Sequence, residues 1–141
     1  MKLHTMAAVM EFVTRMETET AAFYERAADR FPGLAEQFQA FAKENKRFEK
    51  QVKQTYFGVI TDTLESNYCF EGLDDQDFAV DASLPVEADE ATVRARAVDV
   101  EKALKRFYET AASMSEGLMA DVPRLFKRIA KKRDNRIQTL T

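Results

Sequence analysis

One short motif occurs twice in this chain of 141 residues, at corresponding places in two helical patterns. Residues 23–28 read Phe-Tyr-Glu-Arg-Ala-Ala, and residues 107–112 read Phe-Tyr-Glu-Thr-Ala-Ala. A glutamate precedes the tyrosine by seven residues in each copy, as Glu17 and Glu101. Positions of the next helix also agree between the copies: Phe38, Phe41 and Ala42 match Phe126, Ile129 and Ala130. Agreement in both helices predicts two similar helical hairpins, an internal repeat.

Four stretches carry apolar residues at alternating steps of three and four, the spacing of helices that pack on one another. The first hairpin is predicted over residues 5–62, with Thr5 as N-cap and a tight connection at Pro32-Gly33. The second is predicted over residues 92–141, its third helix beginning near 89–92 and its fourth near Val122-Pro123. Residues 63–91 lack a sustained period and predict a long acidic crossover. Its apolar residues should pack along the bundle: Tyr68, Phe70, Leu73, Phe78 and Leu84.

These patterns predict an all-α fold over a single domain, residues 1–141. The expected architecture is an antiparallel four-helix bundle with a long crossover between the second and third helices. The hydrophobic content of 45% and charged content of 32% are typical of a globular chain. Since no apolar run approaches the roughly 18 residues of a membrane span, no membrane association is expected. Cys69 is the only cysteine, which favours a reducing, cytoplasmic location.

Charge is distributed unevenly along the chain. Between Gln54 and Val93 there is no lysine or arginine, whereas the last helix is rich in both. Such a basic helix has two interpretations, contact with nucleic acid or another anionic partner, or a solvated face that offsets the acidic segment. The net charge of −3 and the lack of a recognition motif favour the solvated face, so nucleic-acid binding is not expected.

The glutamate followed by Phe-Tyr, the duplicated hairpins and the long crossover resemble the ferritin-like superfamily, and rubrerythrin-type domains most closely. The resemblance covers nearly the whole chain. In such bundles two helices each supply one glutamate and the other two each supply Glu-x-x-His, and together these hold two iron or manganese ions. The resemblance implies that Glu17 and Glu101 occupy the single-glutamate positions.

The remaining ligand positions implied by the resemblance do not carry ligands. They fall on Asn45 and Phe48 in the second helix and on Arg133 and Arg136 in the fourth. Phenylalanine has no donor atom, and guanidinium stays protonated. A site with two histidines is excluded as well, because the chain has a single histidine, at position 4.

We therefore expect an ion-pair network at this position. An inward Glu17 or Glu101 would be costly without a partner, since burial penalises a lone carboxylate; a carboxylate at the edge of the seam, in water, is the other interpretation. Arg133 and Arg136 lie at comparable depth and would neutralise the two glutamates, with Asn45 beside them. The resemblance further implies that Tyr24 and Tyr108 are second-shell partners of the carboxylates. Packing of two buried aromatics explains them equally well.

In an alternative interpretation, the bundle retains a metal site. A local π-bulge would turn Glu44 and Asp134 inward, and with Glu17 and Glu101 they would form an oxygen-only site for iron or manganese. The chain would then be a rubrerythrin-like oxidoreductase, a ferroxidase or a peroxidase. It lacks Cys-x-x-Cys pairs, and hence the rubredoxin-like module of full-length rubrerythrins.

The sequence favours a non-catalytic ferritin-like protein without a cofactor, for which no catalytic residue is assigned. Such a protein would act by binding an unknown protein or small-molecule partner. Rubrerythrin-type bundles commonly dimerise, and apolar residues expected outside the seams add to the expectation of a homodimer: Phe12, Phe57 and Leu118.

Overall fold

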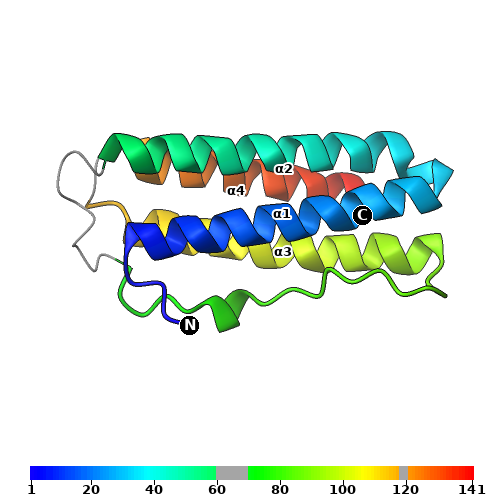
Figure 1. The fold of residues 1–141 in the computed structure, drawn as a ribbon, viewed down its shortest axis with the longest axis horizontal. Helices are drawn as coiled ribbons and strands as arrows, with labels where there is room; N and C mark the ends of the chain where they lie inside the picture. Colours follow the sequence, from blue (N-terminus) through cyan, green and yellow to red (C-terminus); the bar gives the residue numbers. More distant parts are fainter. Residues whose placement is uncertain (60–69, 118–120) are drawn as a thin grey trace.

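The computed structural model describes residues 1–59, 70–117 and 121–141. Its elements are four long helices and one short 3₁₀ helix (Figure 1): α1 Met6–Arg30, α2 Pro32–Val59, η3 Asp75–Phe78, α3 Glu90–Met114 and α4 Asp121–Leu140. The helices form two antiparallel hairpins, α1 with α2 and α3 with α4, and α2 also lies beside α4. The predicted all-α four-helix bundle with a long connection between the second and third helices is confirmed.

The helix ends follow from local chemistry. Thr5 caps α1, since its hydroxyl accepts a hydrogen bond from the amide of Ala8 at 3.2 Å. Asp89 caps α3 through the amide of Thr92 at 2.8 Å. A single residue, Phe31, separates α1 from α2, and Pro32 opens α2 at a position that needs no amide hydrogen. The predicted ends of the first hairpin, residues 60–62, lie outside the described residues.

The described part of the crossover, residues 70–89, runs along α1 and α3 (Figure 1). Phe70, Leu73 and Phe78 are buried and Leu84 is partly buried, as the sequence predicts, while Tyr68 lies outside the described residues. The N-terminal residues pair with this segment, because the amide of Leu3 donates to the carbonyl of Leu73 at 2.8 Å. The crossover is therefore a packed layer of the fold.

The burial of Phe12 contradicts one prediction from the sequence. The sequence predicts an exposed Phe12 on the first helix, but only 2% of its surface is accessible. Its ring lies 4.7 Å from that of Phe107, and Phe78 of the crossover packs on Phe107 at 5.4 Å. The N-terminal segment and crossover cover this side of α1, so Phe12 gives no support to a homodimer. Phe57 is exposed as expected, and Leu118 lies outside the described residues.

A polar layer divides the core of the bundle. On one side lies an apolar cluster that includes Val13, Phe48 and Phe126, and on the other lies a cluster that includes Phe38 and Ala97. Between them are six polar side chains, each at most 3% exposed: Glu17, Thr20, Asn45, Glu101, Arg133 and Arg136. Charged groups at this depth are tolerated only when they are paired and hydrogen-bonded.

Across the described residues, no helix combines the length and apolar character needed to cross a bilayer.

Candidate functional site: a buried glutamate–arginine layer

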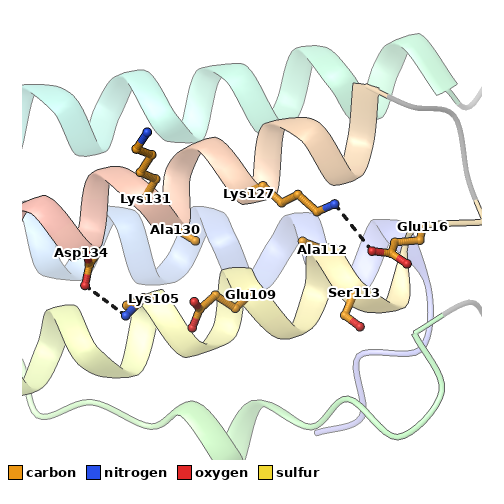
Figure 2. Close-up of a pocket in the computed structure, with 9 residues that line it drawn as sticks. All are labelled: Lys105, Glu109, Ala112, Ser113, Glu116, Lys127, Ala130, Lys131 and Asp134. Atoms are coloured by element: carbon orange, nitrogen blue, oxygen red, sulfur yellow. Dashed lines mark hydrogen bonds and ion pairs between the residues drawn. The ribbon is translucent and has the colours of Figure 1, made fainter.

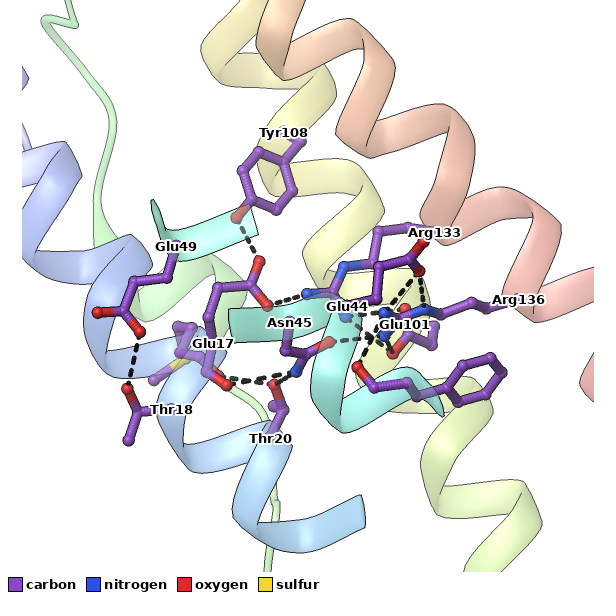
Figure 3. A network of polar contacts seen from close by, with 12 residues as sticks. Glu17, Thr18, Thr20, Glu44, Asn45, Glu49, Glu101, Tyr108, Arg133 and Arg136 are labelled. Carbon is purple, nitrogen blue, oxygen red and sulfur yellow. Dashed lines mark hydrogen bonds and ion pairs between the residues drawn. The ribbon is translucent and has the colours of Figure 1, made fainter. Parts of the chain in front are cut away.

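All four long helices contribute to the polar layer, which Figure 3 shows from close by. Glu17 comes from α1, Asn45 from α2, Glu101 from α3, and Arg133 with Arg136 from α4. The structure brings these five predicted residues together in the interior. Each occupies the packed seam of its helix, because the apolar spacing continues through its position with neighbours such as Val13 and Leu104.

Arg133 joins the two glutamates. Its Nη1 donates to both carboxylate oxygens of Glu101, at 2.9 Å each, and its Nη2 donates to Oε1 of Glu17. All three side chains are fully buried. The guanidinium thus bridges the carboxylates of α1 and α3, with Nε as a buried donor for which the described residues supply no acceptor.

Arg136 extends the network toward α2. Its Nη1 donates to Oε2 of Glu101 at 3.2 Å and to Oδ1 of Asn45 at 2.8 Å. Its Nη2 donates to Oε1 of Glu44 at 2.9 Å and to the backbone carbonyl of Phe41 at 3.1 Å. Glu44 sits at the edge of the layer, with 28% of its side chain exposed. In the interior, the positive charges of the two arginines balance the negative charges of the two buried glutamates. The third carboxylate, that of Glu44, is partly exposed to solvent.

The repeated tyrosines bind the glutamates in a crossed arrangement. Tyr24 of α1 donates its hydroxyl hydrogen to Oε2 of Glu101, in the other hairpin. Tyr108 of α3 donates to Oε2 of Glu17 in the same manner. Each copy of the repeated motif therefore places its tyrosine on the glutamate of the other copy, which ties the two hairpins together.

Asn45 and Thr20 complete the hydrogen bonding of the layer. The Asn45 amide donates to the hydroxyl of Thr20 at 2.7 Å and to the backbone carbonyl of Glu17 at 3.3 Å. Thr20 in turn donates to the carbonyl of Met16 at 2.7 Å. These contacts fix the amide so that its oxygen faces the cation of Arg136.

Phe48 packs against the cations. The guanidinium carbon of Arg133 lies 5.2 Å from the centre of its ring, and that of Arg136 lies 5.3 Å from it. Phe41 lies nearer still to Arg136, at 4.5 Å. Aromatic faces attract cations and also exclude water, so these rings support two arginines far from solvent.

The surroundings of Glu101, Arg133, Tyr24 and Tyr108 shift the pKa of each of these groups. Burial alone would raise the pKa of Glu101, but the positive charges of Arg133 and Arg136 outweigh it and the pKa is lowered. Burial would lower the pKa of Arg133, yet the two glutamates raise it well above its usual value. Burial, followed by the neighbouring carboxylates Glu101 and Glu17, raises the pKa of Tyr24 and of Tyr108. These shifts favour an ionised Glu101 and Arg133 and two neutral phenols at neutral pH.

The raised tyrosine pKa values predict a loss of stability in alkali. In the folded protein Tyr24 and Tyr108 keep their protons, whereas in the unfolded chain they release them near pH 10, at about the ordinary value. Their contribution is therefore complete below about pH 10 and falls as pH rises through the folded-state values. Urea unfolding at several pH values should show a steeper loss above pH 10 for the native protein than for the Tyr24→Phe/Tyr108→Phe variant. Parallel losses would contradict this assignment.

The four carboxylates of the oxygen-only alternative do not gather. Both α2 and α4 keep α-helical geometry through positions 44 and 134, so no π-bulge turns these residues inward. Glu44 faces Arg136, and Asp134 points into a surface pocket between α3 and α4, where it pairs with Lys105 at 3.0 Å (Figure 2). Among residues 1–59, 70–117 and 121–141, no three side chains of His, Cys, Asp or Glu form a group suited to a metal ion.

The residues present do not fit a di-iron or di-manganese centre. The space between the two inward glutamates is taken by Arg133, whose guanidinium offers donors only and cannot ligate a cation. The same group supplies the positive charge that the carboxylates need.

Comparisons of the chain with models of known protein families, with curated proteins and with solved structures find no match.

Proposed function

We propose that this chain is a ferritin-like bundle of the rubrerythrin type in which a guanidinium layer replaces the di-metal site, and that it acts without catalysis by binding a partner. The single observation that supports this most directly is the bridge made by Arg133 between Glu17 and Glu101. The resemblance to rubrerythrin-type domains places these two glutamates at metal-ligand positions. A permanently charged group between them supplies the neutralisation without any redox chemistry.

The duplicated geometry supports the ferritin-like part of the proposal. The crossed contacts of Tyr24 with Glu101 and of Tyr108 with Glu17 relate the hairpins to each other as two similar halves. Such a pattern is expected of a bundle that arose by duplication around a shared central site. Phe48 stands where the resemblance places a histidine, and here it packs on both guanidinium groups.

The non-catalytic part rests on the inertness of the layer. Its charges are paired, its glutamates are fully buried, and Tyr24 and Tyr108 hold their protons at neutral pH. A general acid or base needs a pKa near the working pH, whereas the pKa of Glu101 is lowered and those of Tyr24 and Tyr108 are raised. We accordingly expect function to reside on the surface, and the interior layer to fix how the two hairpins pair.

Metal content tests the proposal. The protein should be produced with iron and manganese supplied, purified without chelators, and measured by elemental analysis beside the Glu17→Gln/Glu101→Gln variant. We expect less than about 0.1 metal ion per chain in both, because Arg133 already neutralises the carboxylates. Near-stoichiometric metal in the native protein that disappears in the variant would overturn the proposal.

A further inference from the structure

We infer that a groove beside the first turns of α3 is the surface through which two copies of this chain associate. The groove lies where the end of α3 that begins at Glu90 comes close to the C-terminal end of α4 (Figure 1). Its volume is 670 Å³, enough to take side chains of a neighbouring molecule. Self-association goes beyond the proposed function, because it concerns a second copy of the chain and does not depend on the guanidinium layer.

The walls of the groove are mainly apolar. Ala91, Ala95 and Val98 of α3 form one side, and Leu140 of α4 forms the other. Ala91 and Ala95 are exposed, and Val98 is only partly buried. Steps of four and three place these three residues on one stripe of α3, which faces away from the core that buries Ala97. Covering this stripe with another apolar surface is favourable, because it removes apolar area from water.

One cation and one anion flank the apolar stripe on opposite sides. Arg94 immediately precedes Ala95, and Asp99 immediately follows Val98. Because each residue turns an α-helix by about 100°, the two charged side chains lie about 70° from the middle of the stripe in opposite directions. Both also line the groove. The cation therefore borders one side of the stripe, and the anion borders the other side five residues farther along the helix.

Neither charge has a strong counter-charge within the described part of the chain. Arg94 has one ion pair, with Glu90 one turn before it, at 3.5 Å between solvent-accessible side chains. A pair of this kind contributes little, because water screens it. Glu90 also lies against the α1–α2 connection, since a Cβ atom on Gly33 would lie 3.1 Å from its Oε2. Asp99 forms no ion pair with any of residues 1–59, 70–117 and 121–141.

The two charges are complementary between copies when the two α3 helices run parallel. In a parallel pair related by a two-fold axis along the helices, the side of one stripe that carries Arg94 faces the side of the other that carries Asp99. Two equivalent ion pairs then form, each across an offset of about 7.5 Å along the helix axis. An antiparallel pair would bring the two Arg94 sides together and the two Asp99 sides together. The charges therefore select the parallel arrangement.

Lys102 determines where the contact ends. It follows Val98 by four residues and continues the stripe, so a parallel pair brings it toward Lys102 of the second copy. A lysine at a packed position of paired helices costs stability, so the two helices should touch over residues 91–99 and diverge beyond them. A contact of this length buries less than the roughly 1,200 Å² of total area that stable complexes need. The dimer is therefore weak and depends on protein concentration.

Sedimentation velocity of the native protein, from about 1 µM to about 1 mM, tests the inference. We expect a reversible monomer–dimer equilibrium with a dissociation constant of about 100 µM, in keeping with a small interface. Arg94→Asp and Asp99→Arg should each weaken the dimer about tenfold or more, because like charges then meet across the contact. An equimolar mixture of the two single variants should associate with about the native strength, since arginines of one copy then face carboxylates of the other.

Two further variants separate this groove from other surfaces. Arg47→Asp makes the same charge change as Arg94→Asp at an exposed position of α2 and should leave the dissociation constant unchanged. Lys102→Ala removes the facing lysines and should tighten the dimer about threefold or more. Circular dichroism of every variant checks that the bundle remains helical.

Any of five results would overturn the inference. These are a monomer at every concentration, equal losses for Arg47→Asp and Arg94→Asp, failure of the mixed variants to associate, no tightening by Lys102→Ala, and a monomer that carries a co-purified small molecule in native mass spectrometry. Elemental analysis of the same samples keeps this test apart from the proposed function. A metal-free monomer would remove the dimer contact alone, whereas metal-loaded protein would contradict the non-catalytic assignment whatever its oligomeric state.

Discussion

Replacing Arg133 with methionine should lower the free energy of unfolding by about 3–5 kcal/mol, the usual cost of removing one partner from a buried ion pair. Methionine matches the arginine side chain only as far as about Nε, so Glu17 and Glu101 lose the guanidinium that bridges them. Both carboxylates are fully buried, so water cannot replace the lost donors. Urea unfolding followed by circular dichroism at neutral pH measures the effect.

Two further variants of the same helix make this result interpretable. Arg128→Met applies the same chemical change to an exposed position, where we expect a change within about 0.5 kcal/mol. Arg133→Lys keeps the charge but replaces a planar fork with a single ammonium, so it should recover part of the loss and not all of it. A loss below about 1 kcal/mol for Arg133→Met would contradict a paired-charge core.

Replacing Glu101 with glutamine should be nearly as damaging, with a loss of about 3–5 kcal/mol. Glu101 accepts hydrogen bonds from Arg133, Arg136 and Tyr24, so the neutral amide leaves two buried cations facing Glu17 and the edge residue Glu44 alone. Among the side chains that the structure describes, only those of Arg133 and Tyr108 donate to Glu17. Glu17→Gln should therefore cost less than Glu101→Gln in the same unfolding experiment.

The matched control for this pair is Glu109→Gln, which makes the same change at an exposed position of α3. We expect it to shift the free energy of unfolding by no more than about 0.5 kcal/mol. The reverse order, with Glu17→Gln the more damaging of the two, would mean that Arg136 contributes little to the charge of the layer.

Much of the fold is encoded in patterns that the sequence displays directly. Steps of three and four mark the faces that are buried, and caps such as Thr5 and Asp89 mark where helices begin. The duplicated motif identifies which positions of the hairpins correspond. The burial of Phe12 could not be predicted in this way, because it depends on the crossover folding back over α1. The periodicity of one helix carries no information about such a tertiary contact.

The layer itself was only partly predictable. The ferritin-like resemblance places Glu17, Glu101 and the two arginines at one site, and charge balance predicts that they pair, because buried carboxylates need cations. Nothing in the spacing revealed that each tyrosine crosses to the glutamate of the other hairpin, since that depends on how the hairpins sit against each other. The sequence suggests Glu44 only as an inward metal ligand, because its contact with Arg136 depends on the approach of α2 to α4.

A crystal structure of protein prepared with iron and manganese, with anomalous data collected at both metal edges, tests the central claim most directly. We expect a planar guanidinium from Arg133 between the carboxylates of Glu17 and Glu101, the hydroxyls of Tyr24 and Tyr108 on Oε2 of Glu101 and of Glu17, and no anomalous peak in the layer. An anomalous peak between those carboxylates, with Arg133 and Arg136 turned toward solvent, would contradict it.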